Sequence, residues 1–175
     1  SGGRRIKDGV DATDSMIGHI KSAQIETVEI DTPLVIRRHS LEPDSFGHGK
    51  FRGGASICFE CETRIPETIF TVRGLDRFRF QPWGFDGGSA GRNGRTFLNP
   101  GTPRETELGK ITVLTLRQGE LLQMVSPSGG GFGDPLARDP ERVLRDVLDE
   151  LLSSGLALSV YGVVIKDRAV DVEAT

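Results

Sequence analysis

SPSGGGFGDP, residues 126–135, carries three consecutive glycines and a fourth after one phenylalanine, with a proline near each end. A glycine-rich turn between a strand and a helix can direct backbone N–H groups at an anion, so the flanking elements decide how this stretch is interpreted. A strand-like run does precede it, and a helix-like run follows. However, six residues, 134–139, separate its last glycine from that helix, and neither phosphate-loop pattern fits through it. We therefore interpret it as a glycine bend, and leave open a close backbone approach to another chain or to a substrate.

Short apolar or alternating runs precede this bend and are typical of strands, because they are rich in β-branched residues and bounded by turn formers. No helical pattern of useful length fits between residues 34 and 126, so antiparallel pairing is expected. The sequence predicts a mainly β fold, an antiparallel sandwich or barrel with glycine-rich loops. Gln118-Gly119 also indicates a hairpin over 111–126. The predicted strands are residues 34–41, 55–62, 67–73, 111–117 and 120–126.

One C-terminal amphipathic helix is predicted at about residues 140–153. Asp139 is a good N-cap, a proline suits the first helical position, and Gly155 is the expected C-cap. Its apolar stripe is expected to pack on the β-domain or to form a subunit contact. Residues 156–165 are expected to form a short helical turn that leads into a last strand. The expected organisation is an N-terminal segment continuing from a missing upstream portion (1–33), a β-domain (34–135), and the helix, final strand and tail (136–175).

Composition limits the classes of partner. The net charge is −3 and the 22 basic residues are scattered, so no basic face for nucleic acid is evident. No apolar run approaches the roughly 18 residues that span a bilayer, and a cytoplasmic protein without a membrane partner is the default expectation. The two cysteines, Cys58 and Cys61, lie in a strand-like run, where they face opposite sides. They are expected to be buried structural thiols.

Five stretches, taken together and in order, resemble the C-terminal part of the hydantoinase B family. The resemblance covers nearly all of this chain, but only about the last third of the family's full-length chain. Each motif alone is weak evidence for the family, whereas five motifs in the same order are specific. The five motifs are PDS followed by FGHGKFRGG (43–54), LDRFRFQPWGFDGG (75–88), GRNGRTFLNPGT (91–102), SPSGGGFGDPLARDPERVLRDV (126–147) and VYGVVI (160–165).

The resemblance implies a subunit of an ATP-dependent enzyme. The family includes N-methylhydantoinase B subunits, the corresponding half of 5-oxoprolinases, and a subunit of acetone- and acetophenone-type carboxylases. A hydantoinase-A-like partner would use ATP to phosphorylate the substrate oxygen, and the B-type subunit would complete ring opening of a hydantoin or 5-oxoproline. The alternatives are a ketone carboxylase and a non-catalytic β scaffold for assembly. A divalent metal is possible, and the family's metal motif lies in the upstream B-type portion that is missing here.

Candidate site residues follow from the matched motifs and from side-chain chemistry. Arginines suit phosphorylated or carboxylate groups because their fork donates two hydrogen bonds. For Arg52 and Arg77 the alternative is bracing of neighbouring loops, with Asp44 or Asp76 as acceptor. For Trp83, core packing is favoured over a place beside the substrate. The predicted catalytic residues are Glu26, Arg52 and Arg77, the predicted substrate-binding residues are His48, Asp76, Arg79 and Trp83, and the metal candidates, which the resemblance does not carry, are Asp14 and His19.

Overall fold

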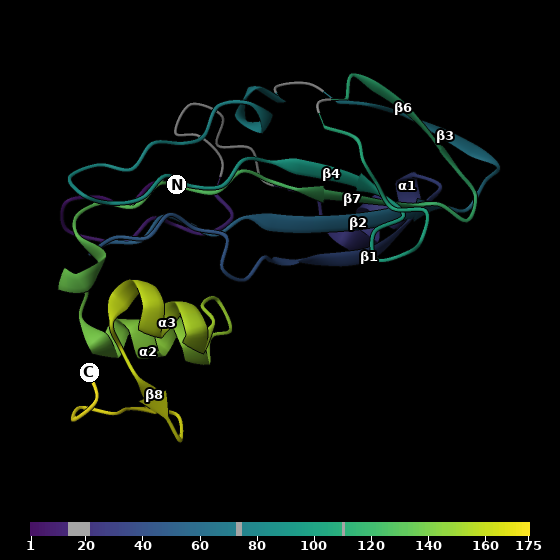
Figure 1. Ribbon diagram of the computed structural model, residues 1–175. Helices are drawn as coiled ribbons and strands as arrows, with labels where there is room; N and C mark the ends of the chain where they lie inside the picture. The colour runs from purple at the N-terminus through teal and green to yellow at the C-terminus, as the bar shows by residue number, and fades with distance from the viewer. Residues whose placement is uncertain (14–21, 73–74, 110) are drawn as a thin grey trace.

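The computed structural model describes residues 1–13, 22–72, 75–109 and 111–175, and its centre is a five-stranded antiparallel sheet. Figure 1 shows this sheet with a smaller sheet at one end and helices below the other. The prediction of a mainly β, antiparallel fold is confirmed, and in the described part of the chain the sheets do not close into a barrel. In spatial order the strands are β1 (Leu34–Leu41), β2 (Ile57–Thr63), β7 (Leu121–Val125), β4 (Arg95–Leu98) and β5 (Thr106–Glu107).

A second sheet of two strands, β3 (Glu67–Thr71) and β6 (Val113–Arg117), covers one face of the first. Between the two sheets, Cys61, Leu116 and Leu122 are completely buried. The predicted hairpin over 111–126 is therefore wrong. The chain does turn after Arg117, whose carbonyl accepts from the Glu120 N–H at 3.0 Å. However, β6 then pairs with β3, while β7 pairs with β2 and β4, because both strands turn their leucines into one core.

The two cysteines lie on β2 and face opposite sides, as the alternation of a strand requires. Cys61 packs between the sheets, and both thiols are free and have no exposed surface. Burial raises the pKa of each thiol to about 11, so both stay protonated near neutral pH. Their prediction as buried structural thiols is confirmed.

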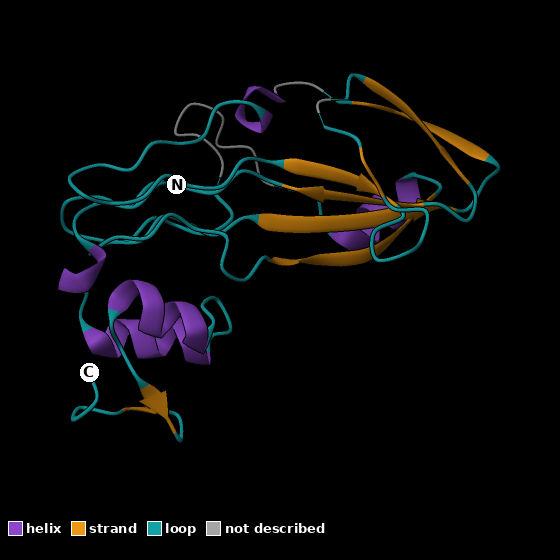
Figure 2. Cartoon of the chain, in the orientation of Figure 1, coloured by secondary structure: helices purple, strands orange, loops and turns teal. Residues whose placement is uncertain are grey.

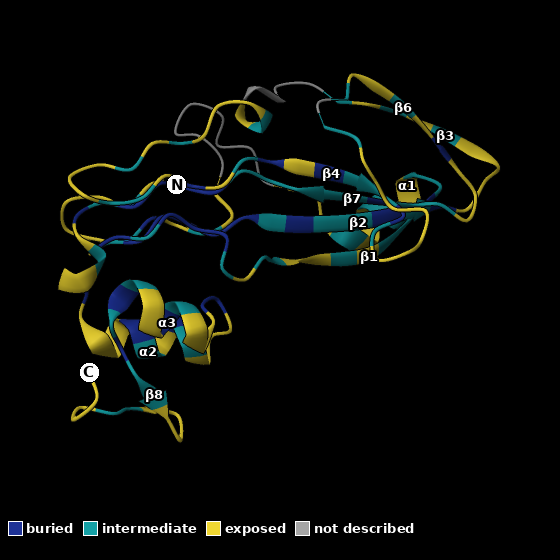
Figure 3. Cartoon of the chain, in the orientation of Figure 1, coloured by how far each residue is buried: buried dark blue, intermediate teal, exposed yellow. Residues whose placement is uncertain are grey.

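Beyond the strand ends, the chain continues as a layer of extended segments, which we call the glycine bundle. It consists of residues 1–9, 47–54, 83–91 and 129–133 (Figure 2). Isolated β-bridges join these segments, Phe51 with Phe132 and Phe85 with Phe132. Figure 3 shows that burial continues from β2 into these segments. Residues 129–133 form the central segment, and their backbone groups make hydrogen bonds to the other three segments. Gly129 N–H donates to Gly54 O, Gly47 N–H to Gly129 O, and Gly3 N–H to Gly130 O, each at 2.8 Å, and Gly131 N–H donates to Ser89 O at 2.9 Å.

The three consecutive glycines are required because backbones approach on every side. A Cβ on Gly129, Gly130 or Gly131 would overlap the carbonyl of Ser1, Trp83 or His48, respectively. Only glycine permits such close packing of chains, as it does at the axis of collagen. The stretch is thus no phosphate loop, and the close approach left open by the sequence is made to other segments of the same chain.

Two helices, α2 (Pro140–Leu148) and α3 (Ser154–Tyr161), lie beneath the bundle (Figure 1). The predicted single helix over 140–153 is wrong, because the chain leaves the helix at Asp149 and Glu150 takes a left-handed φ of 58°. This break lets the next two leucines enter the core under the bundle. That core contains Phe46, Ala55, Val143, Leu151, Leu152, Ala157, Tyr161 and Val163.

Gly155 is not the C-cap that the sequence predicted. It lies in the first turn of α3, which begins after the N-cap Ser153 and ends at Gly162, with φ of 69°. The predicted helical turn and last strand after residue 156 correspond to α3 and to a small hairpin of β8 (Ile165–Lys166) and β9 (Ala169–Val170).

The remaining described elements are short. Helix α1 (Ile25–Asp31) lies against β1, where Glu29 Oε1 accepts from the Ile36 N–H at 2.7 Å. Two 3-10 turns are also described: η1 (Leu75–Phe78) precedes the bundle segment 83–91, and η2 (Pro135–Ala137) follows the bundle segment 129–133. Among the described helices, none has the length and apolar content needed to span a membrane.

Candidate functional site

A buried charge network joins the glycine bundle to α2. Arg52 donates from Nε to Asp146 Oδ1 at 2.8 Å and from Nη1 to Asp11 Oδ1 at 2.7 Å. Arg138 donates to Asp8 Oδ1 at 2.7 Å and to Asp146 Oδ2 at 2.8 Å. Because Asp146 lies on α2 and binds both arginines, it connects the helix to the distant segment of Arg52 and to Arg138, which lies just before the helix.

The hydrogen bonds of this network hold its carboxylates in the charged form. Burial by itself raises the pKa of Asp8, but the hydrogen bond and charge of Arg138 hold that pKa below its ordinary value. Burial also raises the pKa of Asp11, but the hydrogen bond and charge of Arg52 hold that pKa below its ordinary value. Arg142 Nη1, 3.6 Å from Asp8 Oδ2, adds a third guanidinium to the three carboxylates, so the network carries little free charge toward a ligand.

Arg52 is only 7% exposed, and its described hydrogen bonds all go to protein groups: Asp11, Asp146 and the Gly53 carbonyl. These contacts support the bracing interpretation, while a catalytic role stays a prediction. Of the two proposed acceptors, Asp44 instead accepts from the Ser153 N–H at 2.7 Å. The side chain of Asp76 lies outside the described ones, so its role as acceptor stays a prediction.

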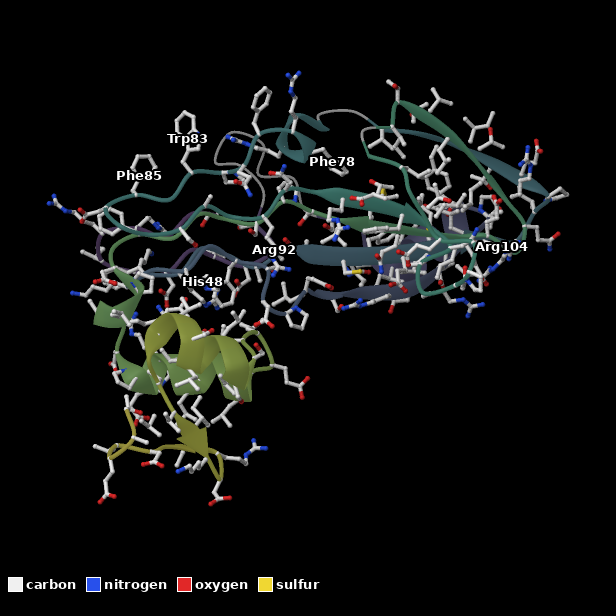
Figure 4. The ribbon with its side chains drawn as sticks, in the orientation of Figure 1. His48, Phe78, Trp83, Phe85, Arg92 and Arg104 are labelled. Carbon is white, nitrogen blue, oxygen red and sulfur yellow. The ribbon has the colours of Figure 1, made fainter. Side chains whose placement is uncertain are left out.

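His48 lies on the underside of the glycine bundle, facing α3 (Figure 4). Its Nδ1 is 3.2 Å from Tyr161 Oη, and its ring meets Phe46 and Tyr161 edge to face. Burial lowers the pKa of His48, while it raises that of Tyr161. The pair is therefore neutral near pH 7. His48 is half-buried, and its predicted role in substrate binding stays a prediction.

A cleft of about 600 Å³ opens on the opposite side of the bundle. Arg77, Trp83 and Phe85 line it together with Ser1 and the backbone of residues 126–130. Trp83 is 76% exposed, so the favoured prediction of core packing is wrong. The reason is that its backbone carbonyl, rather than its ring, meets Gly130. Figure 4 shows Trp83 and Phe85 projecting from the bundle on the side away from α2 and α3.

Of the predicted site residues whose side chains are described, Arg77 and Trp83 line one cleft and the others lie elsewhere. Arg77 donates to the Gln81 carbonyl at 3.4 Å. Arg79 is exposed, and its guanidinium stacks on Phe80 with 5.2 Å between Cζ and the ring centroid.

Glu26 is exposed on the first turn of α1. Figure 1 shows α1 by the main sheet, distant from the glycine bundle. Asp14 and His19 lie outside the described residues. The described residues therefore do not bring Glu26, Arg52 and Arg77 together, and the two metal candidates stay a prediction.

The network residues other than Arg52 were missed from the sequence. One signal was present, because Asp146 lies three residues after Val143 and so interrupts the apolar face of the predicted helix. A charge at that position of an apolar stripe indicates a buried partner. Nothing in the sequence pairs it with Arg52 or Arg138, which come from other segments.

The described residues do not fit a metal ion. No group of three His, Cys, Asp or Glu side chains gathers among them. Asp8, Asp11 and Asp146 come closest in kind, but guanidinium groups occupy their oxygens. Oxygen ligands of a hard cation must be free to face it, so this network is structural rather than metal-binding.

The antiparallel sheet, the bundle of glycine backbones and the charge network that anchors α2 define a β-rich domain. The chain belongs to the hydantoinase B/oxoprolinase family, whose model matches residues 1–135. This confirms the resemblance seen in the motifs.

Relatives extend the likeness along the whole chain. A chain assigned as the B-type component of a D-/L-hydantoinase, from Pseudomonas sp. strain NS671, is 36% identical over 177 residues, covering 99% of this chain and 30% of the relative. The crystal structure of an ATP-dependent caprolactamase from Pseudomonas jessenii matches with a TM-score of 0.84 and 32% identity, over 99% of this chain and 31% of the other. Nucleotide-free acetone carboxylase matches in fold, with a TM-score of 0.79 and 22% identity, over 97% and 27%. The chain thus spans about 30% of the first of these relatives.

Proposed function

We propose that this chain is the C-terminal part of a B-type subunit in an ATP-dependent hydrolase that opens cyclic amides. The observation that carries the proposal is the likeness to ATP-dependent caprolactamase, at 32% identity over 99% of the chain. An unstrained cyclic amide is a poor electrophile, and phosphorylation of its oxygen converts that oxygen into a leaving group. An A-type partner subunit would supply this step with ATP, which implies a cytoplasmic location.

Within such a complex, the cleft at Trp83 is the surface of this chain best suited to substrate. The Arg77 guanidinium can bind a phosphoryl or carboxylate oxygen, and Trp83 offers an apolar face to a ring. We assign Arg52 a positioning role, because its fork is occupied by Asp11 and Asp146. Glu26 lies on α1, so a contact from it to substrate would belong to another face of the subunit.

The test uses the full B-type subunit in complex with its A-type partner. We expect ATP consumption that depends on a cyclic amide, with the linear product detected by mass spectrometry after incubation with hydantoin, 5-oxoproline or caprolactam. Carbon incorporation from bicarbonate into acetone, with no amide opening, would instead favour the carboxylase alternative. ATP consumption that responds to neither substrate class would contradict both.

A second function, assembly without chemistry, is favoured by one observation. Phe80, Trp83 and Phe85 are 58%, 76% and 61% exposed within six residues of sequence, which is typical of a protein-binding surface. Trp83→Ala and Arg77→Ala separate the two functions, with Arg104→Ala at the far end of the molecule as control (Figure 4). Lost turnover in an intact complex supports a substrate cleft, whereas a complex that dissociates with turnover retained per assembled unit supports assembly.

A further inference from the structure

A smaller cavity, of about 390 Å³, lies beside β4 and β7, next to the residues that lead into the glycine bundle. It opens on the sheet face opposite β3 and β6, because Leu98 and Leu122 point toward β6 whereas Phe97 and Gln123 alternate with them and line the cavity. Its volume is within the range of small-molecule sites, about 300–1,000 Å³. None of the residues predicted from the motifs belongs to it. Its lining is Glu42, Ser45, Ser56, Arg92, Asn93, Arg95, Phe97, Gln123 and Val125.

Two lining residues have buried polar atoms that lack a hydrogen-bond partner among the described residues: Ser56 Oγ and Asn93 Oδ1. Ser56 is 1% exposed. The Asn93 amide is oriented by its nitrogen, which donates to the Phe78 carbonyl at 3.2 Å and so leaves the oxygen as the free end. Buried polar groups are nearly always paired in native proteins, so two orphans in one cavity wall indicate a missing partner.

The positive charge of the cavity is also uncompensated. Arg95 is matched by Glu107, which it contacts at 3.0 and 3.1 Å, and Glu42 is matched by Arg38 at 2.9 Å. The Arg92 guanidinium makes no hydrogen bond or ion pair among the described residues. Figure 4 shows Arg92 on the same side of the molecule as His48, away from Trp83 and Phe85.

We propose that this cavity binds a small carboxylate that also carries an N–H donor. The carboxylate pairs with the Arg92 guanidinium, the N–H donates to Asn93 Oδ1, and the Ser56 hydroxyl donates to the ligand. Such a ligand satisfies both orphan atoms and the free charge together, whereas water can pair with the orphan atoms but carries no charge to match Arg92, and a simple anion lacks the N–H donor. Opening of a cyclic amide yields a molecule with these two groups, so the identification of the ligand as the ring-opened product rests on the proposed function, whereas the site itself does not.

Calorimetric titration of the full chain tests the proposal with four probes. N-carbamoylglycine and 6-aminohexanoate carry both groups, hexanoate carries only the carboxylate, and hexanamide carries only the N–H donor. We expect one or both of the first pair to bind at least tenfold more tightly than hexanoate and hexanamide. Arg92→Gln is expected to weaken that binding by tenfold or more, because hydrogen bonds to charged groups are the stronger class. Arg104→Gln, an exposed arginine at the far end of the molecule, is the matched control and is expected to bind as wild type (Figure 4).

Ser56→Ala gives a second, independent measurement. Removing a hydroxyl that has no partner is expected to leave the melting temperature of the ligand-free protein unchanged or higher, while it weakens binding several-fold. A merely structural serine would lower the melting temperature without changing affinity.

The proposal is overturned if neither bifunctional probe binds at millimolar concentration, or if Arg92→Gln binds as tightly as wild type. Its failure is distinguishable from that of the proposed function. Binding that depends on Arg92, in a complex that opens no cyclic amide, supports the site and removes only the identification of the ligand as product. Ring opening without binding at this cavity overturns the site alone.

Discussion

At the scale of single residues, the glycine bundle makes a direct prediction. A Cβ at Gly53 would overlap the Gly129 carbonyl, and both backbones are fixed by hydrogen bonds to neighbouring segments. Gly53→Ala is therefore expected to lower the free energy of unfolding by at least ~2 kcal/mol, as overpacking does. Gly155→Ala is the matched control, because nothing lies within 4 Å of its Cβ position and alanine is the better helix former, by up to ~1 kcal/mol. Equal effects of the two substitutions in urea denaturation would contradict backbone packing.

His48 gives a prediction for pH. Burial lowers its pKa in the folded protein, the nearby Arg92 lowers it further, and Asp44 opposes them. The unfolded chain therefore takes up a proton near its ordinary pKa of about 6.5, whereas the folded chain does so only at lower pH. Stability is complete above about pH 6.5 and falls as the pH drops toward the lower, folded value.

The check is the free energy of unfolding, measured in urea between pH 7.5 and pH 5. His48→Gln is expected to flatten this pH dependence, and His39→Gln, on the exposed side of β1, to retain it. If His48→Gln has the wild-type slope, the loss of stability comes from other groups.

Residue environments were predicted best where local chemistry decides them. The buried thiols of Cys58 and Cys61 follow from strand alternation alone. The exposure of Trp83 did not follow, because a tryptophan among glycines is expected to cover them with its ring, and here the glycine stretch meets the tryptophan's own backbone. Whether the ring or the backbone of a residue contacts a glycine depends on the path of a segment distant in sequence, and no local sequence pattern predicts that path.

At the scale of elements, the boundary between α2 and α3 makes the next prediction. Ser153 Oγ accepts from the Leu156 N–H at 3.3 Å and so caps the start of α3. Ser153→Ala is expected to cost ~1 kcal/mol of stability, the usual effect of losing an N-cap. The adjacent Ser154, exposed in the first turn of the helix, is the control, and Ser154→Ala should stay within ~0.5 kcal/mol of wild type. Thermal unfolding of the two variants checks this, and a reversed order would place the start of α3 elsewhere.

Elements with a strong local pattern were predicted closely, and those defined by tertiary contacts were not. The first predicted strand, 34–41, matches β1 at both ends. Strands β4 and β5 were missed because residues 95–98 and 106–107 are short and lie among turn formers. The helix break after residue 148 was missed because the leucine stripe continues past it, and the core under the bundle, not helical periodicity, determines where Leu151 and Leu152 point.

At the scale of the whole molecule, the resemblance predicted the family, but the candidate site was only partly predictable. Family motifs identify conspicuous segments of the chain, but they do not show whether a segment has a structural or a catalytic role. The glycine-rich motifs form the bundle, and Arg52 braces it, while the two surfaces that we propose bind ligands lie on either side, at Trp83 and at Arg92. Assigning roles required knowing that residues 1–9, 47–54, 83–91 and 129–133 run side by side.

The charge network is the contact on which this arrangement most depends, because it ties the first residues of the chain, the bundle and α2 together. Arg52→Met leaves Asp11 and Asp146 without a main partner in a buried place. Breaking a buried pair in this way typically costs about 3–5 kcal/mol, far more than a surface pair, which is worth about 1 kcal/mol or less. Arg117→Met, which removes the exposed pair with Glu67, is the matched control.

The same variant decides between bracing and catalysis for Arg52. If Arg52 only positions its neighbours, the intact complex with Arg52→Met should denature at lower urea concentration, yet retain its turnover per folded molecule within a few-fold. A large fall in turnover at unchanged stability would instead mean that the guanidinium leaves Asp11 and Asp146 to contact the reacting group. The geometry favours the first outcome. If Arg52 moved away, the buried carboxylates of Asp11 and Asp146 would lose its hydrogen bonds, and only Arg138 would be left to neutralise Asp146.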